Sequence, residues 1–189
     1  MEAEGSRLLT PAEYLALERQ GETKHEYVAG EIFAMAGASR AHNLIVSTTL
    51  TSLNNRLVAR PCDVYPSDMR VKIGSLGIYT YPDITIVCGE SELEDSKQDT
   101  LLNPTAIVEV LSPSTERYDR DLKFQRYRLI YTLRDYLLIA QDEPRVEHYT
   151  IGQDGELGLR VYRTVDTVVD LPTLSYRLPL AEIYARVTF

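Results

Sequence analysis

The sequence is poor in cysteine and has no long apolar run, and both absences exclude classes of protein. Only Cys62 and Cys88 are present and they show no metal-ligand spacing, so a disulfide scaffold or a zinc module is not expected. No apolar run approaches the roughly 20 residues that span a bilayer. The first residues lack the apolar core of a signal peptide. We therefore expect a cytoplasmic protein without a membrane partner.

Positive charge is also scarce. The 189 residues include 20 Lys and Arg against 28 Asp and Glu, a formal net charge of −8. That balance excludes a histone-like protein that coats nucleic acid by bulk charge, but not an enzyme with one local basic surface. The sequence also lacks a P-loop, a dinucleotide fingerprint and a G-x-S-x-G nucleophile elbow. Nucleotide binding of those types and serine hydrolysis are therefore disfavoured.

The order of predicted elements indicates an α/β (α+β) domain over residues 1–189, with a mixed central sheet flanked by helices and a β-hairpin in the C-terminal part. Thr10, Pro11 and Glu13 form a capping box that starts a helix ending near Gly21. The next expected elements are a hairpin turning at 29–30, a long helix over 40–59 and an amphipathic helix over about 119–131 with Leu122, Leu129 and Leu133 on one side. Strands are expected near 64–73, 84–88, 105–112, 135–140, 145–151 and 157–163, with a short helix near 180–184.

Two carboxylates are the most informative feature. Asp83 opens one predicted strand, and Glu109 is the single charge in the apolar strand TAIVEVLS. If these strands form an antiparallel hairpin with Ser96 at the centre of its loop, Asp83 faces Glu109 and Thr85 faces Ile107. Directly opposed residues have Cβ atoms roughly 5 Å apart, where two carboxylates repel unless a proton, a base or a cation compensates. Hard oxygen ligands suit Mg²⁺ or Mn²⁺.

A purely structural reading of the same residues stays open. An isolated Glu in a strand is often at an edge, in contact with solvent, or paired with an Arg. A shift of the register by one residue would also place Asp83 and Glu109 on opposite faces of the sheet. The spacing alone therefore indicates a metal site without establishing one.

A local basic segment follows Glu109. Between residues 117 and 134 six basic residues stand against two acidic ones, a local net charge of +4 in an acidic protein. Lys123 and Tyr127 share one stripe of the predicted helix. Such a patch suits a phosphate backbone, and a solvated helix face with an Asp119–Lys123 pair is the alternative. The candidate DNA contacts are His42, Arg117, Arg120, Arg126 and Tyr127.

The segments HEYVAGEI, YPDITIV, PTAIVEVLSPSTERYDRDLKFQRY and RDYLLIA resemble the family of Uma-type restriction endonucleases, within the PD-(D/E)XK nuclease superfamily. The resemblance extends over nearly the whole chain. It implies a restriction-endonuclease-like sheet, one or two Mg²⁺ (or Mn²⁺) ions, and hydrolysis of DNA phosphodiester bonds. It further implies that Asp83, Glu109 and the Val110 carbonyl bind the metal, with Glu26 as an additional acidic residue.

One position departs from the superfamily pattern, which expects Lys where this chain has Leu111. Lys123 on the following helix is the candidate substitute, acting either as a base or by stabilising negative charge. Cleavage of both DNA strands would favour a homodimer. The alternatives are a catalytically weak or inactive DNA-binding or interaction protein of the same fold, and a nuclease for RNA or branched DNA.

Overall fold

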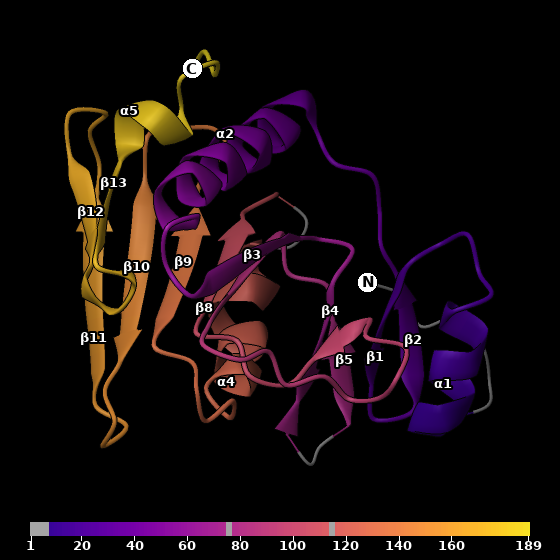
Figure 1. The fold of residues 1–189 in the computed structure, drawn as a ribbon. Coiled ribbons are helices and arrows are strands. Elements are labelled where there is room, and N and C mark those ends of the chain that lie inside the picture. Colours follow the sequence, from indigo (N-terminus) through magenta and orange to yellow (C-terminus); the bar gives the residue numbers. More distant parts are fainter. Residues whose placement is uncertain (1–7, 75–76, 114–115) are drawn as a thin grey trace.

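Six strands form the largest of three sheets in the computed structural model, which describes residues 8–74, 77–113 and 116–189 (Figure 1). Their order is β11-β10-β9-β8-β6-β3. Only β8 and β9 run parallel, so the sheet is mixed, as predicted. Its strands are β3 (Cys62–Pro66), β6 (Ile84–Cys88), β8 (Ala106–Val110), β9 (Asp135–Ile139), β10 (Val146–Ile151) and β11 (Leu157–Tyr162).

The register between β6 and β8 confirms the predicted pairing. Thr85 lies opposite Ile107, with Ile84 opposite Val108 and Ile86 opposite Ala106. Because side chains alternate along a strand, Ile84 and Val108 join one core cluster while Ile107 joins another on the opposite face. Both faces are covered, which explains the almost continuous apolar run in β8.

A second sheet of five strands has the order β2-β1-β5-β4-β7. It begins with the predicted hairpin, which turns at Ala29 and Gly30. Both residues have positive φ (52° and 97°), as a tight two-residue hairpin turn requires. The strands are β1 (His25–Val28), β2 (Glu31–Ala34), β4 (Arg70–Ile73), β5 (Ile78–Thr80) and β7 (Thr100–Leu101).

Two predicted helices cover these sheets. Helix α1 (Pro11–Glu18) starts with the expected capping box between Thr10 and Glu13. It packs on the smaller sheet, where the rings of Tyr14 and Tyr27 stack 4.9 Å apart. Helix α2 (Arg40–Leu57) is capped by Ser39 and supplies buried side chains to the core on one face of the larger sheet.

The C-terminal part completes this core. A hairpin and a short helix place apolar side chains against the same face that α2 covers. The mixed α+β fold with a C-terminal hairpin is therefore confirmed. These elements are β12 (Val168–Leu171), the 3-10 turn η3 (Pro172–Leu174), β13 (Tyr176–Pro179) and α5 (Leu180–Ile183).

The helical segment after β8 differs from the prediction. It consists of α3 (Glu116–Tyr118), the π-helical turn η2 (Asp119–Lys123) and α4 (Phe124–Tyr127), and therefore ends four residues early. The expected apolar side is also wrong, since Leu122 and Leu129 are 52% and 55% exposed. The segment instead turns Lys123, Phe124 and Tyr127 to the sheet, because buried carboxylates there pair with Lys123.

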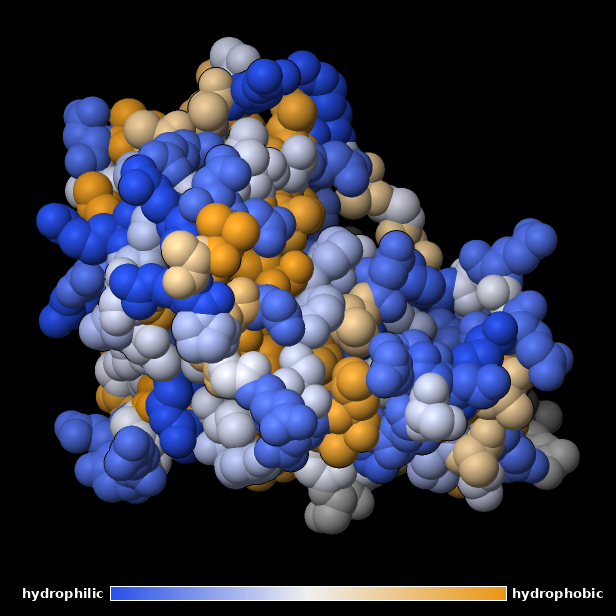
Figure 2. Space-filling view, viewed as in Figure 1, coloured by the Kyte–Doolittle hydropathy of each residue, from blue (hydrophilic) through white to orange (hydrophobic). Residues whose placement is uncertain are grey.

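On the face seen in Figure 2, polar side chains predominate and hydrophobic ones gather mainly below α2. None of the helices in the described part of the chain combines the length and apolar character needed to cross a bilayer.

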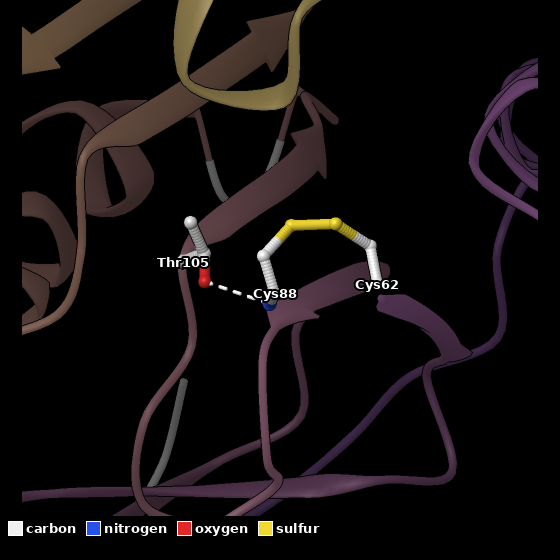
Figure 3. Close-up of a disulfide and its surroundings, with 3 residues drawn as sticks. All are labelled: Cys62, Cys88 and Thr105. Atoms are coloured by element: carbon white, nitrogen blue, oxygen red, sulfur yellow. Dashed lines mark hydrogen bonds between the residues drawn. A yellow bond between two sulfur atoms is a disulfide. The ribbon is translucent and has the colours of Figure 1, made fainter. Parts of the chain in front are cut away.

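The two cysteines form a disulfide that the sequence did not predict (Figure 3). Cys62 on the edge strand β3 lies directly opposite Cys88 on β6. The Cys88 N–H also donates to Thr105 Oγ1 at 2.9 Å. The bond therefore fastens β3 to the strand that follows Asp83.

We expect the variant Cys62→Ala/Cys88→Ala to be less stable than the oxidised protein. The disulfide closes a loop with a sequence separation of 26 residues. Its removal should lower the free energy of unfolding by about 3 kcal/mol, because the unfolded chain gains conformational freedom. Urea unfolding followed by circular dichroism measures the difference. A reducing agent should destabilise the wild type and leave the double variant unchanged; equal sensitivity of both would contradict this role.

Candidate active site

The candidate site begins with the two predicted acids on neighbouring strands. The β6–β8 register, continued by one step, sets Asp83 opposite Glu109 on the face that carries Thr85 and Ile107. Glu109 is 4% exposed. Asp83 directly precedes β6 and Glu109 lies in the neighbouring strand β8, and the charges of the two side chains interact.

A buried lysine joins Glu109 to the smaller sheet. Lys123 Nζ lies 2.8 Å from Glu109 Oε1 and 3.1 Å from Glu26 Oε1 on β1. Asp119 Oδ1, four residues earlier in η2, lies 3.7 Å away. All four side chains are nine-tenths buried or more. The site therefore lies where the two sheets meet, with three carboxylates around one ammonium group.

Hydroxyl groups complete the surroundings of these acids. The Tyr127 hydroxyl donates to Glu109 Oε1 at 2.9 Å and lies 3.1 Å from Thr80 Oγ1 on β5. Tyr118 OH lies 3.5 Å from Glu26 Oε2. These hydroxyls limit the positions that the two glutamates can adopt.

Asp83 has a separate set of partners. Its Oδ2 accepts the main-chain N–H of Val110 at 2.7 Å, and its Oδ1 lies 3.1 Å from His42 Nε2. His42 is in the first turn of α2, where its own N–H donates to the cap Ser39 Oγ. The start of α2 therefore reaches the same end of β8 as Asp83 does.

Burial shifts the proton affinities in this cluster. Burial is the main reason that the pKa of Glu109 rises to about 8; Lys123 opposes the rise, while Asp119 and Asp83 add to it. Burial alone would lower the pKa of Lys123, but its carboxylate neighbours, Glu109 and Glu26 foremost, hold it well above the ordinary value. Lys123 therefore stays protonated at neutral pH, and the Glu109 carboxyl keeps its proton to a higher pH than an exposed glutamate does.

The predicted surface contacts separate into different environments. Arg120 pairs with Glu147 at 2.7 Å and also with Glu116, so its guanidinium is already held by carboxylates. Arg117 is 98% exposed and lies 4.0 Å from Asp121.

Two other predicted contacts lie close to the buried cluster. Arg126 donates to the Tyr118 hydroxyl at 2.8 Å. Tyr127 is fully buried, which places it in support of Glu109 and not at the surface, where a direct DNA contact would require it.

Sequence reasoning missed part of this site. The sequence patterns do not indicate Thr80 or Tyr118, and they indicate Asp119 only as a helix partner of Lys123. The spacing of four residues between Asp119 and Lys123 was the available signal, because such residues are neighbours on a helix. Thr80 has no comparable signal, since only the folded chain brings β5 beside Tyr127.

Carboxylate oxygens are the donors that hard divalent cations prefer. Glu109 and Glu26 are such donors, but both contact the Lys123 ammonium group, while Asp83 contacts His42 and the Val110 N–H. Among the residues that the structure describes, no group of three or more His, Cys, Asp or Glu is arranged to hold a metal. Mg²⁺ does not need such a group, because it commonly binds one or two carboxylates and keeps waters and substrate phosphate as further ligands.

Comparison with known proteins places the chain in a family. Residues 11–181 match the family model Uma2, described as "Putative restriction endonuclease". Two relatives come from Synechocystis. The "Uncharacterized protein sll1609" is 40% identical over 144 residues, 76% of this chain and 81% of the relative. The "Uncharacterized protein slr1290" is 34% identical over 181 residues, 96% of this chain and 94% of the relative.

A solved structure shares the fold. It is the crystal structure of "a putative nuclease belonging to DUF820" from Anabaena variabilis, with a TM-score of 0.75 and 20% identity. The match covers 94% of this chain and 98% of the other. The family model and the Synechocystis relatives each cover most of the chain, and the chain therefore belongs to the Uma2 family.

Proposed function

We propose that the protein is a metal-dependent endonuclease that hydrolyses phosphodiester bonds of DNA. The observation that carries this proposal is the buried cluster in which Lys123 contacts Glu109 and Glu26 beside Asp83. Membership in the Uma2 family, whose model is described as "Putative restriction endonuclease", supports the same reaction class.

In this proposal Asp83, Glu109 and the Val110 carbonyl hold Mg²⁺ or Mn²⁺, with Glu26 as a further acidic group. The bound ion supplies a more acidic water and offsets negative charge on the phosphate. The Val110 N–H and His42 orient the Asp83 carboxylate through the contacts described above. Tyr127 orients Glu109 in the same way.

Of the two roles considered for Lys123, charge stabilisation is the one that its environment favours. A general base must release its proton near the working pH. The carboxylates around Lys123 keep its pKa well above the ordinary value, so it remains protonated. A fixed ammonium beside the acids would stabilise the negative charge that develops on the phosphate.

DNA would approach through His42, Arg117 and the adjacent basic segment. Arg117 is almost fully exposed, so it can exchange its 4.0 Å contact with Asp121 for a phosphate without leaving a buried charge unpaired. Arg120 and Arg126 would first have to exchange their present partners, Glu147 and Tyr118, for phosphate. Cleavage of two DNA strands by identical sites favours a homodimer. The proposed location of the protein is the cytoplasm.

Asp83→Asn should abolish Mg²⁺- or Mn²⁺-dependent nicking of plasmid DNA, because a neutral amide binds a hard cation poorly. Nicking is followed on agarose gels, and Mn²⁺ binding by calorimetry. The matched control is Asp166→Asn, which removes an exposed carboxylate in the loop before β12. If the wild type neither cleaves DNA nor binds Mn²⁺, the inactive DNA-binding or interaction protein becomes the correct reading.

Lys123→Met should lower the cleavage rate by about 100- to 1,000-fold, the effect typical of removing one electrostatic stabiliser. Methionine keeps a similar length without the charge. Single-turnover rates measure the effect, and Mn²⁺ calorimetry shows that the acids still bind metal. The proposal for Lys123 is wrong if this variant binds metal and cleaves as fast as the wild type.

Metal binding should also depend on pH with a defined sign. A metal ion must displace the proton from Glu109, whose pKa is about 8. The affinity for Mn²⁺ should therefore fall by about tenfold per pH unit below this pKa and level off above it. Calorimetry at several pH values tests this, with Glu109→Gln as the variant in which the dependence should largely disappear. An affinity that stays constant between about pH 6 and about pH 8 would contradict the assignment of Glu109 as a metal ligand.

A further inference from the structure

Strand β11 forms one edge of the larger sheet, and its outer side is open. It pairs with β10 through six residue pairs, from Val146–Tyr162 to Ile151–Leu157. Among the described residues, no main-chain hydrogen bond involves the side of β11 that faces away from β10. In Figure 1 the strand lies at the end of the molecule opposite to β1 and β2. An open edge of this kind offers a row of N–H and C=O groups to another strand.

The open edge also carries an apolar row. Leu157, Leu159 and Val161 share one face of β11 and are 42%, 53% and 43% exposed. On β10, by contrast, Tyr149 packs against the Phe124 ring at 4.4 Å. Helical cover therefore reaches β10 and leaves the next strand in contact with solvent.

The usual protections of an edge strand are almost absent here. Proteins block such edges with lysine, proline, bulges or very short strands. The sequence of β11, LGLRVY, contains a single charged residue, Arg160, and no lysine or proline. An unprotected edge with three exposed aliphatic side chains is a surface that binds a further strand.

The strand is complementary to a second copy of itself. An antiparallel pairing with its two-fold axis at Leu159 sets Leu159 against Leu159 of the second copy and Leu157 against Val161 of the second copy. Cross-strand aliphatic neighbours of this kind stabilise a sheet. The whole apolar row is then matched by an identical row.

The opposite face of the strand is complementary in charge. In the same register Arg160 lies opposite Gly158 of the second copy, which has no side chain, and diagonal to Glu156. Long side chains bridge such a diagonal. Arg160 makes no ion pair among the described residues, and Glu156 is exposed. Within each copy, a Cβ at Gly158 would collide with Thr150 Oγ1, so the Thr150 side chain would have to move.

We propose that two copies of this chain associate through antiparallel pairing of their β11 strands, which joins the two larger sheets into one. The pairing is isologous, which means that each copy contributes the same strand. Both open edges are then paired, so association stops at a dimer. It gives the homodimer of the proposed nuclease a specific interface. The interface itself rests on the open strand and is tested by association, independently of DNA cleavage.

Sedimentation velocity or light scattering of the full chain should show a dimer at micromolar concentration. Leu159→Lys should halve the measured mass, because two lysines would then face each other on the two-fold axis. The control is Leu129→Lys, which changes a similarly exposed leucine outside β11 and should leave the dimer intact. Circular dichroism shows whether each variant is folded. A monomeric wild type, or a folded Leu159→Lys protein that remains dimeric, overturns the proposal.

Charge reversal tests the register. Glu156→Arg and Arg160→Glu should each weaken dimerisation about tenfold, because each places like charges on the diagonal twice. The double variant Glu156→Arg/Arg160→Glu should restore the wild-type dissociation constant. If the single variants dimerise as tightly as the wild type, or if the double variant is no tighter than either single one, the antiparallel pairing at Leu159 is wrong.

Discussion

The burial of the Lys123 ammonium group among three carboxylates is the interaction on which the candidate site depends. Its partners Glu26, Glu109 and Asp119 come from the smaller sheet, the larger sheet and the helical segment between them. Removing one partner from such a cluster leaves the remaining charges buried and uncompensated, which costs several kcal/mol. The cluster therefore fixes how the two sheets and the helical segment lie relative to one another at this point.

The same interaction explains the orientation of the helical segment. Lys123 must face the sheet to reach Glu109, and Phe124 and Tyr127 follow it into the interior. Leu122 is then left at the surface, although its apolar side chain alone would favour burial. A buried ionic contact has outweighed a hydrophobic preference here. It also places a cation beside Glu109. The position where the superfamily pattern expects a lysine holds Leu111, which belongs to the apolar core.

The two edge strands of the larger sheet, β3 and β11, are held differently. Strand β3 is fastened to its neighbour by the Cys62–Cys88 disulfide and lies beside the strand that follows Asp83. Strand β11 at the other edge has no such fastening and exposes an apolar row. Asp83 and Glu109 thus lie in the half of the sheet that the disulfide fastens, while the surface proposed for association lies in the other half. This separation allows two copies to join without covering the candidate site of either one.

Local sequence patterns were sufficient for the capping box at Thr10, the helix from Arg40, the hairpin at Ala29–Gly30 and the β6–β8 register, because short-range spacing and strand alternation determine these features. They did not indicate the second sheet, the disulfide, or the burial of Tyr127. Each of those depends on contacts between residues far apart in the chain, such as Cys62 with Cys88, or Tyr127 with Thr80. The sequence by itself thus determined the β6–β8 register, which brings Asp83 and Glu109 to neighbouring positions of the sheet. Only the tertiary structure decided which cation contacts these acids, because the free energy of burying a charge depends on the groups that the fold places next to it.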